Sequence, residues 1–254
     1  QQEFEDAGLT VYATIPLSQE HLKRKQKMRL REKIKQNIRS TQRHELLAEI
    51  NPSDLAIESI RSLRTSLHFA MLEAKNNVVM IAGASPEVGK SFISSNLATV
   101  VAKTGKKVLI LDGDMRKGYL HKIFNKTHKN GLSDLLINDI KLSKCIQESG
   151  IENLDIIVRG KVPPNPSELL MSQGFTQLIE HAQQHYDLVI IDTPPILAVT
   201  DAAIIGNQSG TVLMLARYDH SALKEIITAL NRFDINGVEV KGVIFNAVEK
   251  RASN

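Results

Sequence analysis

The sequence lacks most features that would place it outside the cell or within a membrane. Its 254 residues include one cysteine, Cys145, so an internal disulfide is excluded. No run of 18 apolar residues occurs, and we therefore expect no membrane-spanning helix. Because no secretory signal is visible, we expect the reducing setting of the cytosol, with Cys145 as a buried bystander. The chain starts at Gln1 rather than Met, which predicts a fragment of a longer protein.

The net charge of +4 hides an uneven distribution. Residues 21–44 hold ten of the 32 Lys and Arg residues and one of the 28 acidic ones, which leaves the rest of the chain with a net charge of −5. This basic arm has no interleaved aromatic residues on which bases could stack, so nucleic-acid contact is the least favoured of three interpretations. A solvated arm and an arm that binds an anionic membrane surface remain open.

Residues 78–92 are the stretch around which the chain is organised. An apolar run, Val78–Ala82, is followed by a Gly/Ser/Pro-containing loop and then by Gly89-Lys90-Ser91 at the start of an amphipathic segment. Strand, loop and helix in this order form the context of a phosphate-binding loop, in which backbone N–H groups and a helix N-terminus hold an anion. Lys90 can reach the phosphates and Ser91 can bind Mg²⁺. One departure is that Ala84 occupies the place of the usual first glycine.

The remaining pattern predicts an α/β fold with a doubly wound, mainly parallel sheet and helices on both faces. Apolar runs at residues 108–111, 154–158, 186–191, 211–216 and 243–246 alternate with helical stretches, as in βαβ units. Ligands bind at the carboxyl ends of the strands in such sheets, where Asp112, Asp114 and Asp192 fall. Asp192 fits the Mg²⁺-holding place after a strand, and Asp112 can orient a water, a metal ligand or an attacking hydroxyl group.

The N-terminal part predicts a connector followed by a helix. Val11–Pro16 is expected to be an extended connector, and Asn51–Asp54 has the polar residues and the proline typical of a helix start. The helix should run to about residue 74. Glu58, Arg61 and Arg64 form a charged ridge on it through (i, i+3) spacing. We therefore divide the chain into residues 1–50, a connector with the basic arm, and residues 51–254, the nucleotide-binding domain.

Five motifs occur together in this chain: Ala84–Ser91, Val108–Gly118, Leu188–Pro195, Val162–Leu170 and Glu58-x2-Arg61-x2-Arg64. Together they resemble the bacterial tyrosine kinases, most closely the cytoplasmic domain of the capsule and exopolysaccharide co-polymerase kinases of the Wzc/Etk type, and the resemblance covers nearly the whole chain. It implies a P-loop fold of the deviant Walker type that binds ATP and Mg²⁺ and autophosphorylates tyrosines between the subunits of a ring.

The resemblance also implies roles for individual residues. Catalytic roles fall to Lys90, Asp112, Asp114 and Asp192, with Asp112 as the base. Magnesium would be held by Ser91, Asp112 and Asp192. ATP would contact Ser85, Pro86, Glu87, Val88, Gly89, Lys90, Ser91, Phe92 and, at the adenine, Asn246. Tyr119 resembles the family's internal regulatory tyrosine, and Arg159 the arginine that it contacts once phosphorylated. Glu58, Arg61 and Arg64 match the oligomerisation motif.

The implied partners are those of a membrane-associated regulator of polysaccharide polymerisation and export. They comprise other copies of the chain in a ring, by resemblance an octamer, the protein's own tyrosine-rich tail, a low-molecular-weight tyrosine phosphatase, the export machinery and the anionic inner membrane, but no nucleic acid. The implied location is the cytoplasmic face of the bacterial inner membrane, with this fragment itself soluble.

Two departures from the family pattern leave alternatives open. Glu87 stands where glycine is common, and the tyrosine-rich tail is missing, since no tyrosine follows Tyr218. One alternative is an ATPase switch of the partitioning or septum-positioning kind, although Ser85 holds the place where those proteins have a lysine. The other is a scaffold that uses nucleotide to set ring assembly without physiological kinase activity.

Overall fold

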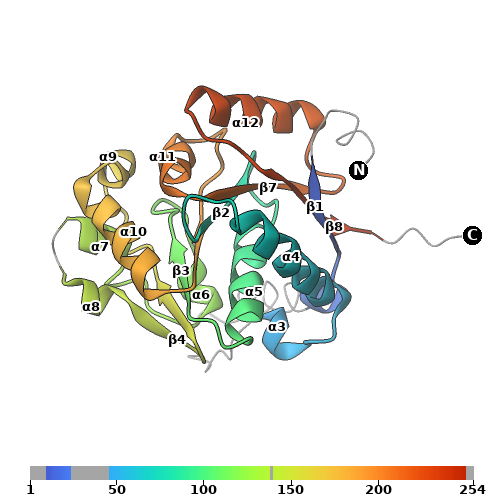
Figure 1. Ribbon diagram of the computed structural model, residues 1–254, viewed down its shortest axis with the longest axis horizontal. Helices are drawn as coiled ribbons and strands as arrows, with labels where there is room; N and C mark the ends of the chain where they lie inside the picture. Colours follow the sequence, from blue (N-terminus) through green and yellow to red (C-terminus); the bar gives the residue numbers. More distant parts are fainter. Residues whose placement is uncertain (1–9, 24–45, 138–139, 250–254) are drawn as a thin grey trace, which may run out of the picture.

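The computed structural model describes residues 10–23, 46–137 and 140–249. Among these residues, eight strands form a single sheet (Figure 1). The strands are β1 (Val11–Pro16), β2 (Val78–Gly83), β3 (Val108–Asp112), β4 (Gln147–Ile151), β5 (Leu154–Ile157), β6 (Leu188–Asp192), β7 (Thr211–Arg217) and β8 (Gly242–Val248).

The helices follow the strands in alternation through most of the chain. They are α3 (Leu47–Ile50), α4 (Leu55–Met71), α5 (Lys90–Ala102), α6 (Leu120–Ile123), α7 (Leu132–Leu136), α8 (Leu142–Cys145), α9 (Pro166–Leu170), α10 (Gln173–His185), α11 (Asp201–Gln208) and α12 (Leu223–Ile235). In the described part of the chain, no helix is both long and apolar enough to cross a membrane.

The strand order is β1-β8-β7-β2-β6-β3-β5-β4, and every neighbouring pair is parallel except β4 with β5. The predicted doubly wound, mainly parallel sheet is therefore confirmed. Because β2, β3 and β6 are adjacent and parallel, the loops that follow their carboxyl ends meet at one edge of the sheet.

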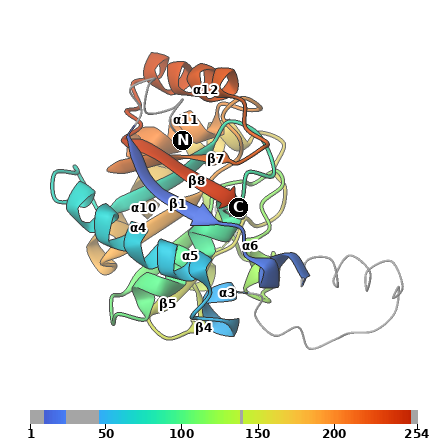
Figure 2. The same ribbon diagram turned by 90° about the vertical axis from the view of Figure 1, so that its right-hand side faces the viewer.

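Alternate residues of each central strand face two separate cores, because successive side chains of a strand point to opposite faces. Val78 and Met80 of β2 pack under α10, α11 and α12, whereas Val79 and Ile81 pack under α3, α4 and α5. Figure 1 and Figure 2 show these helices as layers on the two sides of the sheet. The central strands are buried on both faces, which explains their uniformly apolar sequences.

The N-terminal segment expected as a connector is an edge strand of the sheet. β1 pairs in parallel with β8, with Val11 opposite Val243 and Thr14 opposite Phe245 (Figure 2). β1 is the outermost strand, and only its Ile15 is fully buried. Because few of its residues need to be apolar, the segment lacks the long apolar run that marked the central strands. The division of the chain at residue 50 stays a prediction, with β1 contributing to the sheet from its N-terminal side. Most of the basic arm lies outside the described residues.

Candidate functional site

The loop between β2 and α5 has the backbone shape of an anion-binding cradle. Gly89 is the N-cap of α5 and has a φ of 101°, and Glu87 has a φ of 62°. Left-handed residues alternating with right-handed ones turn successive N–H groups inward, where the helix dipole favours a phosphate. The conformation at residue 87 explains why glycine is common at this place. The Glu87 side chain is exposed to solvent.

Residues from β7, β8 and the turn after β7 hold this loop from outside. Asn246 Nδ2 donates to the Val88 carbonyl at 2.9 Å, and Arg217 Nη1 donates to the Glu87 carbonyl at 3.0 Å. His220 Nε2 lies 3.4 Å from the Pro86 carbonyl oxygen. The sequence motifs gave no sign of Arg217 or His220, which follow the residues that they contact in the loop by 130 and 134 positions. The adenine contact of Asn246 stays a prediction.

Lys90 and Ser91, at the start of α5, face the carboxyl end of β6. Ser91 Oγ donates to Asp192 Oδ2 at 2.5 Å, and Ser94 Oγ donates to Asp192 Oδ1 at 3.3 Å. Asp192 and Lys90 are 2% and 9% exposed. Burial lowers the pKa of Lys90, and the nearby charges of Asp192 and Asp114 oppose this shift. The predicted meeting of phosphate loop and strand-end carboxylate is therefore present in the fold.

Asp112 ends β3 directly beside Asp192 on β6, with which it is in register. Its Oδ2 accepts a hydrogen bond from the Leu120 amide at 3.0 Å, while its buried Oδ1 has no hydrogen-bond partner among the described residues. Burial, followed by the charge of Asp192, raises the pKa of Asp112 well above its usual value. Burial also raises the pKa of Asp192 to about 6, against the hydrogen bond from Ser91 and the charge of Lys90.

Asp114 shapes the turn that follows Asp112. Its Oδ1 accepts hydrogen bonds from the amides of Arg116 at 3.1 Å and Lys117 at 2.8 Å, and its carbonyl accepts one from the Gly118 amide at 2.7 Å. The Asp114 charge nevertheless acts on Lys90, Asp112 and Asp192. All three predicted carboxylates thus lie around the end of the phosphate loop.

The residues of the phosphate loop and the strand-end acids fit a nucleoside triphosphate with Mg²⁺. Two adjacent buried carboxylates, of which Asp112 has its ionisation disfavoured by the charge of Asp192 and one oxygen without a partner among the described residues, form a place that gains from a divalent cation. Among the described residues, no three His, Cys, Asp or Glu side chains are grouped as a metal site. Magnesium is usually held by one or two carboxylates together with phosphate oxygens and water. Ser91, Asp112 and Asp192 match that donor set.

The two predicted regulatory residues lie in the segments that follow β3 and β5. Tyr119 is the N-cap residue of α6 and is 47% exposed. Arg159 follows β5, and its Nε and Nη1 are buried without a hydrogen-bond partner in the described part of the chain. His121, two residues after Tyr119, is close enough to Arg159 to be affected by its charge.

The predicted oligomerisation residues are on α4, which runs from Leu55 to Met71, three residues short of the expected end. Arg61 forms an ion pair with Glu58 on the surface of this helix, and Arg64 is half-buried. Ile57, Ile60 and Leu63 on the opposite side are fully buried. The charged ridge is therefore a surface feature of the single chain.

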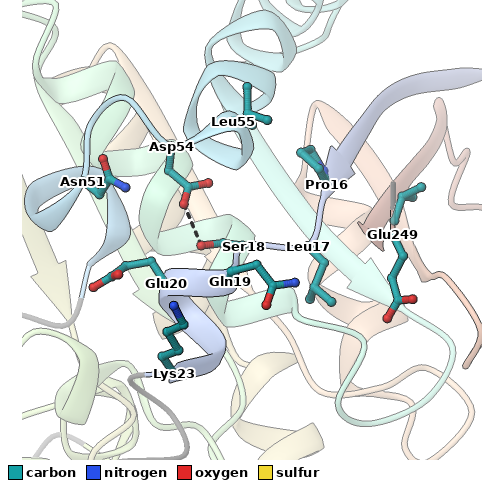
Figure 3. A pocket seen from close by; sticks show the side chains of 11 residues that line it. Pro16, Leu17, Ser18, Gln19, Glu20, Lys23, Asn51, Asp54, Leu55 and Glu249 are labelled. Carbon is teal, nitrogen blue, oxygen red and sulfur yellow. Dashed lines mark hydrogen bonds between the residues drawn. The ribbon is translucent and has the colours of Figure 1, made fainter. Parts of the chain in front are cut away.

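A hollow of about 580 Å³ lies where β1 ends, between the start of α4 and the end of β8 (Figure 3). On its wall, Ser18 Oγ donates to Asp54 Oδ2 at 2.8 Å, and Asp54 also caps α4 through the Ala56 amide. The helical turn after Ser18 carries His21, whose ring centroid lies 4.5 Å from the ring centroid of Phe92 at the start of α5. None of the predicted site residues lines the hollow itself.

Comparison with known proteins agrees with this geometry. Residues 76–236 match the family model described as an AAA domain. The chain is 54% identical over 252 residues to the tyrosine-protein kinase wzc of Salmonella typhimurium, covering 99% of this chain and 34% of that protein. It thus spans about a third of the length of such curated relatives.

Solved structures show the same relationship. The kinase domain of the Escherichia coli tyrosine kinase ETK matches with a TM-score of 0.87 and 47% identity, covering 98% of this chain and 94% of that one. The septum site-determining protein MinD of Pyrococcus horikoshii, solved with Mg-ADP, matches with a TM-score of 0.57 and 23% identity over 67% and 70% of the two chains. This second likeness shows the fold alone.

The eight-stranded, mainly parallel sheet agrees with these matches. The chain therefore belongs to the AAA-domain family and, within it, to the kinase domains of the bacterial tyrosine kinases of the Wzc and Etk type.

Proposed function

We propose that this chain is the catalytic domain of an ATP-dependent protein-tyrosine autokinase, in which subunits of a ring phosphorylate one another and regulate capsule or exopolysaccharide polymerisation and export. The observation that carries the proposal is the hydrogen bond from Ser91 to Asp192, with Asp112 beside it on the neighbouring strand. It brings a phosphate cradle and the acids needed for Mg²⁺ to one place.

The residues of the chain act on the reaction mainly by position and charge. The loop amides and Lys90 would hold the β- and γ-phosphates, and Ser91, Asp112 and Asp192 would hold Mg²⁺, which would supply neutralisation of the charge on the transferring phosphoryl group. Asp112 orients the tyrosine hydroxyl group. A phenol with an ordinary pKa of about 10 is a poor proton donor to a carboxylate in the ground state, so Asp112 accepts the proton late.

The proposed regulation uses Tyr119 and Arg159. A phosphate on Tyr119 would carry about two negative charges and accept short, charge-assisted hydrogen bonds from a guanidinium group. The Nε and Nη1 atoms of the half-buried Arg159 support this role, because buried donors without a hydrogen-bond partner among the described residues gain from an anion.

The proposed assembly is a ring, an octamer by resemblance, in which Arg61 and Arg64 of α4 reach the neighbouring subunit. The tyrosine-rich tail, a low-molecular-weight phosphatase, the export machinery and the anionic inner membrane are its proposed partners. The basic arm would bind the membrane through its ten positive charges.

The test uses the protein with its native flanking sequence, incubated with Mg-ATP and analysed for phosphotyrosine by mass spectrometry. We expect labelled tyrosines in the wild-type protein and at least tenfold less label in Lys90→Met, because charged hydrogen bonds contribute about 1.5–3 kcal/mol. Lys106→Met, at an exposed position after α5, is the matched control and should label normally.

An unlabelled wild-type protein, or equal labelling by Lys90→Met, contradicts the kinase proposal. Nucleotide-dependent ring assembly without any tyrosine label would favour the assembly scaffold instead. ATP hydrolysis without label would favour the ATPase switch.

A further inference from the structure

An ion pair with a buried carboxylate lies outside the residues assigned above. Asp201, the first residue of α11, is fully buried, and its Oδ2 accepts a hydrogen bond from Arg116 Nε at 3.1 Å. Its Oδ1 accepts hydrogen bonds from Arg116 Nη2 at 3.4 Å and from Ser167 Oγ at 2.6 Å. The guanidinium fork thus meets both carboxylate oxygens, which is the arrangement that fixes an arginine most firmly.

The network joins three segments that are far apart in the sequence. Arg116 belongs to the turn after β3, Ser167 to α9, and Asp201 to α11, whose N-terminal end favours an acidic side chain. Figure 1 shows α9 and α11 side by side near this edge, and they are in contact. A buried carboxylate that loses its partner is costly. The ion pair with Arg116 is therefore kept, and Asp201 holds the guanidinium group in place.

The turn that carries Arg116 also carries two of the carboxylates of the site. Asp114 accepts hydrogen bonds from the amides of Arg116 and Lys117, and Gly118 packs against the Asp112 carboxylate. Oδ2 of Asp112 accepts a hydrogen bond from the Leu120 amide at 3.0 Å, while its Oδ1 has no hydrogen-bond partner among the residues described. The course of the chain from Asp114 to Leu120 therefore fixes the direction of this carboxylate. A shift of the Arg116 backbone would therefore move Asp112 and Asp114 together.

We propose that Asp201 is a positioning residue for phosphoryl transfer, which acts through Arg116 to hold the Asp112–Asp114 turn in its reactive shape, with Ser167 as the second anchor of the carboxylate. The proposal rests on the proposed kinase function. It adds a role to Arg116, Ser167 and Asp201, which lie outside the phosphate loop in the sequence.

The test measures transfer from Mg-ATP to a tyrosine acceptor peptide by Asp201→Asn, Arg116→Ala and the double variant, in the protein with its native flanking sequence. We expect kcat to fall about tenfold or more, because misplacement by about 1 Å can cost a hundredfold. KM for ATP should rise less than kcat falls, since Lys90, Ser91 and Asp192 are unchanged. The double variant should be no worse than the poorer single variant, because both changes break one interaction.

Amide hydrogen exchange supplies a second readout that needs no activity. The amides of Arg116, Lys117 and Gly118 should exchange faster in both single variants than in the wild-type protein. An inactive wild-type protein would refute the kinase proposal alone. The exchange rates would still test whether Asp201 and Arg116 hold the Asp112–Asp114 turn in place. If Asp201→Asn does not fold, Arg116→Ala decides the question, because that side chain is 38% exposed.

Glu239→Gln is the matched control, because it removes one charge of the exposed Lys241–Glu239 ion pair. This pair lies just before the start of β8, whereas Asp112 and Asp192 lie at the carboxyl ends of their strands. It should leave kcat unchanged. The proposal is overturned if both Asp201→Asn and Arg116→Ala keep kcat within about twofold of the wild-type value, or if KM for ATP rises as strongly as kcat falls.

Discussion

Gly118 packs its α-carbon against the Asp112 carboxylate, where no side chain fits. A Cβ atom there would collide with Asp112 Oδ1 and the Asp114 carbonyl oxygen. Gly118→Ala should therefore lower the free energy of unfolding by about 1–3 kcal/mol, as overpacking does, and should lower kcat because Asp112 must move. Urea unfolding and transfer assays measure the two effects.

Gly174→Ala is the control for that substitution. Gly174 lies in α10, and the nearest atoms to an added Cβ are 3.6 Å away. This variant should gain about 0.5–1 kcal/mol from helix propensity and keep its activity. Equal effects of the two substitutions would contradict the close packing at Gly118.

His121 makes stability depend on pH in the acidic range. Burial, and then the charges of Arg159, His128 and Lys122, lower its pKa from 6.5 to about 4. The unfolded chain therefore binds a proton between pH 6.5 and 4 that the folded chain does not, so His121 lowers stability as the pH falls through this window. His121→Gln should make the free energy of unfolding fall less steeply over that range.

His68→Gln, at an exposed position in the last turn of α4, is the control for the acid dependence. It should keep the wild-type slope in denaturant titrations at several pH values. A slope unchanged by His121→Gln would show that this imidazole is as easily protonated as in the unfolded chain.

Which residues could be predicted depended on how their contacts are encoded. Lys90, Ser91 and Asp192 stand in short motifs at the ends of strands, so topology alone brings them together. Arg217 and Asp201 support the site through contacts 130 and 85 residues away in the chain, with no local pattern to mark them. Their roles follow only from the three-dimensional arrangement.

At the level of secondary-structure elements, Asp54 joins the start of α4 to the helical turn at residues 19–23, which begins after Ser18. It caps α4 by accepting from the Ala56 amide at 2.9 Å and accepts from Ser18 Oγ at 2.8 Å. Asp54→Ala should cost about 1 kcal/mol for the lost cap, and Ser18→Ala should cost less because the cap remains. Chemical unfolding measures both.

Ser53→Ala is the control for the cap, since Ser53 is exposed and bonds only to Asn51 Oδ1 in the described part of the chain. Its free energy of unfolding should match the wild-type value. A cost for Asp54→Ala no larger than that for Ser53→Ala would show that the cap contributes nothing.

Buried elements were easier to predict than edge elements. β2, β3 and β6 are apolar throughout because helices cover both of their faces. β1 and β4 lie at the two edges of the sheet and are mostly half-buried or exposed, so their sequences carry no comparable apolar run. The antiparallel β4 was missed for the same reason. The helices α6 to α9 were missed because each has only four or five residues, too few to show a helical period.

At the scale of the whole molecule, the ring proposal depends on α4. Arg61→Ala combined with Arg64→Ala should shift an assembled species toward the monomer in analytical ultracentrifugation, because the residues that reach the neighbour are removed. Lys106→Ala with Lys122→Ala removes the same charge from exposed positions elsewhere and should leave the sedimentation unchanged. Identical sedimentation of the two double variants would refute the role of Arg61 and Arg64.

The central claim is that the phosphate loop and the strand-end acids form one magnesium-nucleotide site. Calorimetric titration with ADP, with and without Mg²⁺, tests it directly. We expect Mg²⁺ to tighten binding to the wild-type chain, Asp192→Asn to remove most of that gain, and Lys90→Met to weaken binding at least tenfold, as for the loss of a charged hydrogen bond of about 1.5–3 kcal/mol. Failure of the wild-type chain to bind ADP, or an affinity independent of Mg²⁺ and of Asp192, would contradict the account.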